Sequence, residues 1–342
     1  TSVMITLGFL VFAIVMFAWE KIPLSITAMV VAVGLHLSGV LSAKEAFAGF
    51  VDPNVLLFMG MFVIGEAFFA TGVAVGVGNV VHKFAKTETS LLVAVMMITG
   101  ILSGFLSNTG TAAVLIPVII GICKKSGFKQ TKLLMPLVFA AAMGGNISLI
   151  GAPGNMIAQA GLQQAGLGSF GFFDYGLVGL PILIVGTIFY ATIGKRFLPD
   201  APSHQPDGAF EGNEDYSHVP SWKKWTAALV LILTVGAMIF EKQLGVKLYV
   251  SAWVGALVLV ATNVISETAA VKSIDMKTIM LFAGSMALGD AMVKTGTGSV
   301  IADIIVNSLG ASPSPIVVLV VIFVLGVFMT NFMSNTATCA LL

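Results

Sequence analysis

Two long runs of uncharged residues constrain this chain more than any other feature of its sequence. No Asp, Glu, Lys or Arg occurs over the 35 residues from Thr89 to Cys123 or over the 39 residues from Ile304 to Leu342. A helix needs about 20 apolar residues to cross a bilayer, so each run can cross the hydrocarbon core or enter and leave it. Only 10% of all residues are charged, against about a quarter in soluble domains. The sequence therefore predicts an all-α polytopic membrane protein.

Each uncharged run contains a cluster of hydroxyl and amide side chains. The first cluster, 103–111, reads Ser-Gly-Phe-Leu-Ser-Asn-Thr-Gly-Thr, and the second, 330–338, reads Thr-Asn-Phe-Met-Ser-Asn-Thr-Ala-Thr. One such cluster alone could simply hydrogen-bond neighbouring helices. Because the pattern is duplicated, we interpret the pair as a binding site, since helix breaks and polar clusters at matching places in two halves are typical of transporters.

An internal repeat relates the two halves of the chain. Residues 54–72 and 278–296, which are 224 positions apart, share Phe, two Gly, an acidic residue, Ala, Thr and a final Gly at the same places. The acidic residues are Glu66 and Asp290. Each is a candidate either for handling a proton or cation or for pairing with a neighbouring donor. The polar clusters follow at a spacing of 227, which requires a three-residue insertion.

The basic residues predict how the halves cross the membrane. Threading the predicted spans places thirteen of the seventeen Lys and Arg residues on one side, which the positive-inside rule makes cytoplasmic. The two halves are then inverted. For residues 89–123, two full crossings and a re-entrant hairpin would both leave the flanking basic residues on the cytoplasmic side. We expect a hairpin with its tip near the midplane, because its short polar tip would fit an external loop poorly and irregular backbone at that depth must line a cavity or be buried.

The predicted organisation is a first repeat over 1–196, a hydrophilic linker over 197–222 and a second repeat over 223–342. The first repeat contains the hairpin, about 89–123, and a helix over about 133–166 that is broken between Gly144 and Asn155, where Pro153 removes a backbone donor. The second repeat ends soon after its tip, 334–336, so we expect it to be truncated before a second broken helix. A weak interface helix is expected over 72–84, and the first apolar stretch is expected to be a true span.

The tips offer oxygens and amides but no charge. If each hairpin bends at Ser-Asn-Thr, its first arm ends in free carbonyls and its second arm begins with free amides. Oxygen ligands suit a hard cation, so we predict one sodium site at Ser103, Asn108 and the backbone near Gly151, and another at Thr330 and Asn335. The amides and positive helix ends suit a carboxylate. Its predicted donors are Ser107, Asn108, Thr109, Ser334, Asn335 and Thr336.

The sequence contains no motif typical of a nucleic-acid-binding protein, a metal-binding protein or an enzyme. The net charge is +1 and no basic block suggests nucleic acid. Cys123 and Cys339 have neither metal-ligand spacing nor an evident partner, so we interpret both as structural. The histidines, at 36, 82, 204 and 218, lie outside both polar clusters, and no zinc-protease or nucleophile-elbow motif occurs. An enzyme is therefore not expected.

The paired Ser-Asn-Thr tips, each followed by small residues, resemble the divalent anion:sodium symporter family, and so does the segment 144–155. The resemblance implies sodium-coupled symport of dicarboxylates or tricarboxylates such as succinate or citrate. It also implies a homodimer in the cell membrane, with a scaffold domain and a transport domain that moves the site across as an elevator. The implied sodium ligands are Ser103, Ser107, Asn108 and Gly151, with Thr330 and Asn335 in the second half.

The resemblance adds Pro153 and Asn155 to the implied substrate contacts. Where the family commonly has Gly-Thr-Pro before this Asn, the chain has Gly151-Ala152-Pro153, so one hydroxyl is missing. The alternative is another member of the ion transporter superfamily: an anion exchanger, an arsenite permease or a sodium/proton antiporter. Such a protein would require ionisable residues at the site, and the tips have none.

Overall fold

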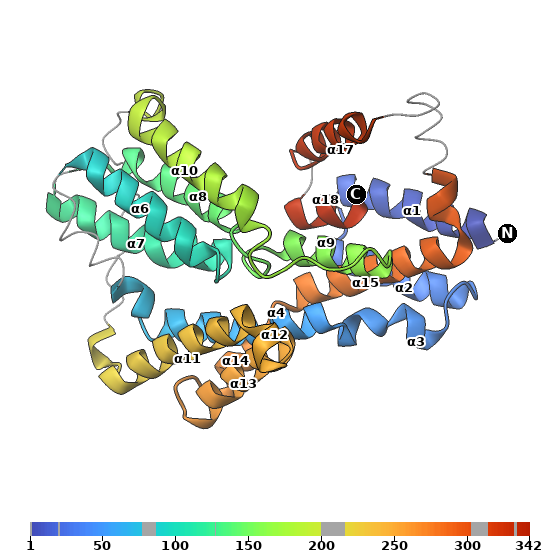
Figure 1. Cartoon of the computed structure of the whole chain (residues 1–342), viewed down its shortest axis with the longest axis horizontal. Coiled ribbons are helices and arrows are strands. Elements are labelled where there is room, and N and C mark those ends of the chain that lie inside the picture. Colours follow the sequence, from blue (N-terminus) through green and yellow to red (C-terminus); the bar gives the residue numbers. More distant parts are fainter. Residues whose placement is uncertain are drawn as a thin grey trace. The chain divides into compact units, whose positions relative to one another are not determined.

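A computed structural model describes residues 2–19, 21–76, 87–126, 128–199, 216–301, 314–331 and 334–342. Within these ranges the regular elements are helices (Figure 1). The longer ones are α1 (Ser2–Trp19), α2 (Leu24–Leu37), α4 (Pro53–Ala70), α6 (Glu88–Ser103), α7 (Asn108–Ser126), α8 (Leu134–Gly144), α9 (Pro153–Gln164), α10 (Gly176–Thr192), α11 (Ser221–Ile239), α13 (Leu248–Ala261), α15 (Met276–Thr295) and α17 (Pro315–Met329). The short ones are α3 (Ala43–Ala46), α12 (Glu241–Leu244), α14 (Glu267–Ser273), α18 (Asn335–Leu341) and the 3-10 turns Ala48–Val51, Gln130–Lys132, Gly194–Arg196 and Tyr216–His218.

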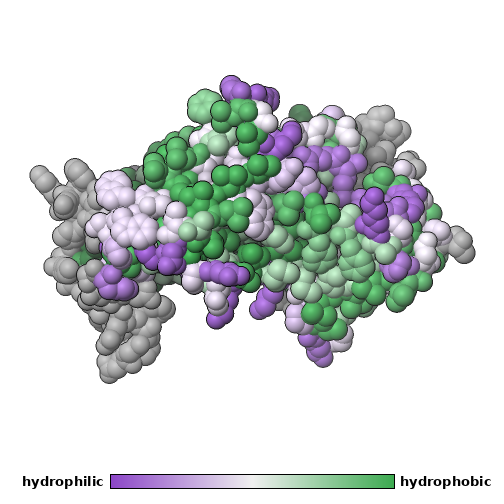
Figure 2. All heavy atoms as spheres, turned by 90° about the horizontal axis from the view of Figure 1, so that it is seen from below, coloured by the Kyte–Doolittle hydropathy of each residue, from purple (hydrophilic) through white to green (hydrophobic). Residues whose placement is uncertain are grey.

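Several of these helices suit a membrane. By length and composition, α1, α4, α11 and α15 can each cross a bilayer, and α2, α6, α7, α10, α13 and α17 are shorter apolar helices. Hydrophobic side chains form broad areas of the surface seen in Figure 2. Along α17 every described side chain is at least partly exposed. The described part of the chain is therefore all-helical, as expected of a polytopic membrane protein. Most of the predicted interface helix and linker, with His82 and His204, lies outside the described residues.

The chain forms two compact units. Unit 1 comprises residues 1–56, 156–169 and 275–342, and unit 2 comprises 57–155 and 170–274. In unit 1, α2 and α15 pack along each other and α1 packs against both. In unit 2, α6, α7, α8 and α10 pack together around a core that includes Met96, Leu137 and Leu183, and α11 packs on α13. The first polar cluster lies in unit 2 and the second in unit 1.

The relation at 224 residues also covers the helices that precede the repeat at 54–72 and 278–296. Helices α2 and α13 begin at Leu24 and Leu248 and have the same length of 14 residues. Each is followed by a residue at positive φ, Gly39 (75°) or Asn263 (56°). A short helix with a Ser cap then follows in both halves, α3 and α14. Gly and Asn are the residues that tolerate this left-handed conformation best, so different side chains provide the same turn.

Two close helix crossings follow the same relation. A Cβ added at Gly60 in α4 would lie 2.7 Å from the Cβ of Ala252 in α13, within unit 2. A Cβ added at Gly284 in α15 would lie 2.7 Å from the Cβ of Ala28 in α2, within unit 1. The two glycines are 224 positions apart, and so are the two alanines. Small residues at such crossings are typical of membrane helices. Reciprocal contacts of this kind are expected where two equivalent halves exchange helices about a two-fold relation.

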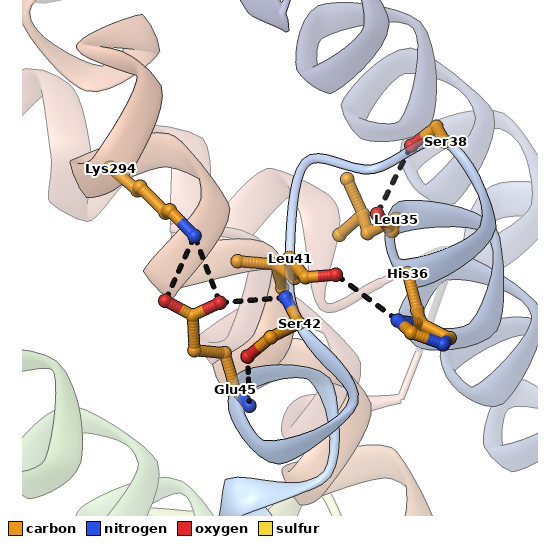
Figure 3. A network of polar contacts seen from close by, with 7 residues as sticks. All are labelled: Leu35, His36, Ser38, Leu41, Ser42, Glu45 and Lys294. Carbon is orange, nitrogen blue, oxygen red and sulfur yellow. Dashed lines mark hydrogen bonds and ion pairs between the residues drawn. The ribbon is translucent and has the colours of Figure 1, made fainter.

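An ion pair ties the turn after α2 to the end of α15 within unit 1 (Figure 3). Lys294 Nζ lies 2.9 Å and 2.8 Å from the two carboxylate oxygens of Glu45. Glu45 also accepts a hydrogen bond from the Ser42 amide at 2.7 Å, as part of a capping box. Next to it, His36 Nδ1 donates to the Leu41 carbonyl at 3.1 Å. The hydrogen bonds from Lys294 and then from Ser42 lower the pKa of Glu45 to about 2.

Candidate functional site

Both polar clusters form a break between two helices, α6 and α7 in the first and α17 and α18 in the second. A serine caps the second helix in each case. Ser107 Oγ accepts a hydrogen bond from the Gly110 amide at 3.0 Å, and Ser334 Oγ accepts one from the Ala337 amide at 3.1 Å. Such caps satisfy one of the free amides at a helix N-terminus.

A second hydrogen bond crosses each break. Ser103 Oγ lies 2.7 Å from the side-chain amide of Asn108. At the equivalent place in the second half, Thr330 Oγ1 donates to Asn335 Oδ1. Both pairs are five residues apart. The two tips therefore share one local design, in which the last turn of the first arm is held to the first residue of the second arm.

The first tip packs against the broken helix within unit 2. In the orientation that satisfies its neighbours, the Asn108 amide donates from Nδ2 to Ser103 Oγ at 2.7 Å, to the Ala141 carbonyl at 3.2 Å and to the Gly151 carbonyl at 3.0 Å. Ser103 Oγ also donates to the Ala141 carbonyl, at 2.7 Å. The structure thus brings together Ser103, Asn108 and Gly151, which the sequence predicts as ligands of one sodium ion.

The interruption between α8 and α9 gathers carbonyl oxygens beside this tip. The position that a Cβ would occupy at Gly151 lies 2.5 Å from the Gly145 carbonyl oxygen and 3.0 Å from that of Gly104, so only glycine fits there. Ser148 Oγ donates to the Gly104 carbonyl and accepts from the Ile150 amide at 3.2 Å. Oxygens gathered without a counter-charge are ligands that hard cations prefer.

Asn155 holds the interruption in shape. Its buried side chain donates from Nδ2 to the carbonyls of Gly145 at 2.8 Å and Ser148 at 2.9 Å. Tyr175 donates from its hydroxyl to the Asn155 carbonyl at 2.7 Å. Asn155 therefore has a supporting role in addition to the substrate contact that the family resemblance implies. Pro153 is half-buried at the first position of α9, where a missing amide hydrogen costs nothing.

The first tip also presents groups that suit an anion. Ser107 and Thr109 are exposed, whereas Ser103 is fully buried. Because α7 begins at Asn108, the amides of Asn108 and Thr109 have no acceptor within the helix. The positive end of the helix lies behind them. No charged residue occurs in 103–111 or 144–155, so the site has no fixed charge to balance an anion.

The second tip, in unit 1, is more open. Thr330, Ser334 and Asn335 are exposed and Thr336 is half-buried. Residues 332 and 333 lie outside the described part of the chain. The predicted sodium ligands Thr330 and Asn335 are in contact, whereas the counterpart of the broken helix does not occur in this sequence.

The two repeat-related acids have different surroundings. Asp290 accepts a hydrogen bond from Gln164 Nε2 at 3.1 Å, and the neighbouring Gln163 accepts one from Asn54 Nδ2 at 3.2 Å, all within unit 1. Both glutamines lie at the end of α9. Glu66, in unit 2, makes no hydrogen bond or ion pair with any residue that the structure describes. The pairing interpretation thus has a specific donor for Asp290.

Three residues at or near the site were not singled out from the sequence: Ser148, Tyr175 and Gln164. Ser148 lies in the glycine-rich interruption, where a hydroxyl inside a buried segment was a usable signal. Tyr175 and Gln164 lie outside every polar cluster, and no pattern marks them. Among the described residues, no group of three or more His, Cys, Asp or Glu side chains could hold a metal ion. Neither Cys123 nor Cys339 forms a disulfide bond among the described residues.

Comparison with known proteins places this geometry among transporters. The sequence profile of a family described as citrate transporter matches residues 14–342. The uncharacterized transporter YfbS of Escherichia coli is 34% identical over 203 residues, which cover 59% of this chain and 33% of YfbS. An uncharacterized transporter of Haemophilus influenzae is 26% identical over 356 residues, covering 98% of this chain and 75% of the relative. The sodium-dependent dicarboxylate transporter SdcS of Staphylococcus saprophyticus is 24% identical over 360 residues, covering 94% of this chain and 68% of SdcS.

Proposed function

The chain belongs to the citrate transporter family, and from this premise we propose that it couples the entry of sodium ions to the uptake of a di- or tricarboxylate such as succinate or citrate. One observation supports the proposal above all others. In two uncharged helix breaks a hydroxyl and an Asn side chain five residues apart are hydrogen-bonded, Ser103 with Asn108 and Thr330 with Asn335. At each break, oxygen atoms that can bind a cation lie next to a helix N-terminus that can bind an anion. The similarity to a sodium-dependent dicarboxylate transporter is consistent with this pairing of ligands.

Sodium supplies the positive charge that the site itself lacks. A carboxylate cannot be balanced by Lys or Arg here, since neither occurs in 89–123 or 304–342. A sodium ion beside the tip would face the oxygens of Ser103 and Gly151, where the Nδ2 group of Asn108 now lies. Binding would therefore require the Asn108 amide to turn, which presents Oδ1 to the ion and frees Nδ2 for the substrate. Through this turn, sodium binding would prepare the anion site.

We further propose that the two halves are inverted and that both hairpins are re-entrant. The reciprocal crossings of Gly60 with Ala252 and Gly284 with Ala28 support a two-fold relation between the halves. The distribution of basic residues supports the inversion. A homodimer, elevator movement and a place in the inner or plasma membrane rest on the family resemblance. The alternative, another ion transporter superfamily member, would assign Glu66 and Asp290 to ion transfer.

Uptake by the full-length protein in proteoliposomes tests the proposal. Labelled succinate and citrate are offered with an inward sodium or potassium gradient. We expect sodium-dependent uptake of at least one of them and its loss in both Asn108→Ala and Asn335→Ala. Asn331→Ala is the matched control, because Asn331 lies beside the second tip but, among the described residues, its side chain donates to the Val327 carbonyl of α17, at 2.6 Å, and not to the tip. Uptake that ignores sodium and follows a proton gradient or internal anion would instead support the alternative.

A further inference from the structure

Two buried threonine hydroxyls are unpartnered at equivalent positions of the two hairpins. Thr111 in α7 is fully buried and Thr338 in α18 is 6% exposed, and neither Oγ1 has a hydrogen-bond partner among the described residues. Thr111 follows Asn108 by three residues, and Thr338 follows Asn335 by three. Residues three apart on a helix share a face. Each hydroxyl therefore lies one turn beyond the Asn of its own tip, on the same side of the second arm.

Six other threonines, in helices or at their C-terminal ends, satisfy their hydroxyls locally. Thr71 and Thr295, a repeat-related pair, each donate to the carbonyl four residues earlier at 2.7 Å. The same bond is made by Thr6, Thr192, Thr226 and Thr262. A helical threonine has two common rotamers, and one of them makes this bond. Thr111 and Thr338 do not make it, so their hydroxyls are turned away from their own helix carbonyls.

The face of α7 that carries Thr111 begins at the candidate site with Asn108. Leu115 and Ile119 continue this face and pack in the core that α7 forms with α6 and α8. From the start of the same helix, Asn108 reaches Ser103 on α6 and the Ala141 carbonyl on α8. The hydroxyl of Thr111 therefore lies on the inner side of the hairpin. The backbone is equivalent at the second tip, since the amides of Thr111 and Thr338 both donate to the carbonyl of the capping Ser at 2.9 Å.

The hydroxyls of Thr27, Thr99, Thr131 and Ser251 are also buried and unpartnered among the described residues. Thr27 and Ser251 are related by the repeat spacing of 224, but they lie in α2 and α13, away from both Ser-Asn-Thr tips. Thr111 and Thr338 differ from them in lying one turn beyond the tips. An unpaired hydroxyl in an apolar interior costs free energy, and a cation bound at the tip would supply the missing partner there.

We propose that the hydroxyls of Thr111 and Thr338 bind the sodium ion of their own hairpin, either directly or through one bridging water. This inference rests on the proposed sodium coupling and adds one oxygen ligand to each cation site. The competing explanation is that each hydroxyl rotates to bond the carbonyl of the capping Ser. In that case, replacing the hydroxyl with a methyl group would leave the response to sodium unchanged.

The test compares sodium dependence in the full-length protein for Thr111→Val, Thr338→Val and Thr111→Ser. Valine has nearly the shape of threonine but no hydroxyl, and serine keeps the hydroxyl. Thr187→Val is the matched control, because Thr187 is buried in α10 and its hydroxyl donates to Met97 Sδ, at 3.7 Å, as its one partner among the described residues. Two readouts are measured: the sodium concentration that gives half-maximal uptake, and the rise in melting temperature that sodium produces relative to potassium.

We expect both valine variants to need at least fivefold more sodium and to lose most of the sodium-induced rise in melting temperature. Thr111→Ser and Thr187→Val should stay within twofold of the wild type. A cooperative melting transition in potassium verifies that each variant is folded. If the Thr111→Val protein cannot be purified in folded form, the result for Thr338→Val tests the proposal by itself. Valine variants with wild-type sodium dependence would overturn the assignment of the hydroxyls while sodium coupling stands. A wild type that does not respond to sodium would overturn the proposed function, and the assignment with it.

Discussion

Replacing Asn155 with Asp tests the hydrogen bonds that shape the interruption between α8 and α9. Asn155 Nδ2 donates to the carbonyls of Gly145 and Ser148 at 2.8 Å and 2.9 Å. Aspartate has nearly the same shape but, when ionised, no donor, so three acceptors would face one another in a buried place. A hydrogen bond contributes about 0.5–1.5 kcal/mol net, and a buried group left unsatisfied costs about 1–3 kcal/mol. Two lost bonds thus predict a destabilisation of about 2–4 kcal/mol.

The measurement is the melting temperature of the full-length protein in detergent, followed by tryptophan fluorescence and by size exclusion after heating. For a chain of 342 residues, a loss of this size corresponds to a decrease of about 3–6 °C. Asn146→Asp is the matched control, because Asn146 lies in the same interruption with an exposed side chain. Part of the loss should be recovered at low pH, where the new carboxyl group at position 155 becomes protonated and regains one donor. Equal melting temperatures of Asn155→Asp and Asn146→Asp would refute the bonding that we describe.

Two further predictions concern packing and pH. A Cβ at Gly144 would lie 2.5 Å from Gly100 Cα. Gly144→Ala should therefore cost about 1–3 kcal/mol in thermal unfolding, whereas Gly161→Ala, with nothing within 4 Å of the added Cβ, should be neutral. Lys294→Met should raise the pKa of Glu45 from about 2 toward its usual 4.5. A carboxyl group whose pKa is lowered in the folded state stabilises the fold at pH values above its unfolded-state pKa. The melting temperature of the wild type should therefore exceed that of Lys294→Met slightly at neutral pH, and this difference should disappear as the pH falls from about 4.5 to about 2. An advantage that does not change with pH would contradict the ion pair.

The positions of the helices and of both tips follow from local sequence features. The uncharged run 89–123 forms α6 and α7, with the break at its polar cluster, because a Ser cap and small residues there favour a new helix start. The interruption in the predicted helix 133–166 lies between Gly144 and Pro153, where glycine and proline weaken helical structure. In such cases a few neighbouring residues determine the backbone, so the sequence suffices to predict it.

Contacts between distant segments could not be predicted in this way. The bond from Ser148 to the Gly104 carbonyl joins residues whose spacing carries no periodic signal. The bond from Gln164 to Asp290 likewise depends on how α9 packs within unit 1. The relation between α2 and α13 was predictable, because comparison at the spacing of 224 pairs Leu24 with Leu248, Ala28 with Ala252 and Ser42 with Ser266. The turn that follows was not, because Gly39 and Asn263 share a backbone conformation rather than a side chain.

The crossings of Gly60 with Ala252 and Gly284 with Ala28 also bear on how the chain is made. Each crossing joins a helix from the first half to a helix from the second half. During synthesis, α2 therefore enters the bilayer with its small-residue face uncovered and stays so until α15 has been translated. Neither half can complete a unit by itself. If the halves were produced as two separate polypeptides, each should be degraded alone and both should be recovered when they are made together.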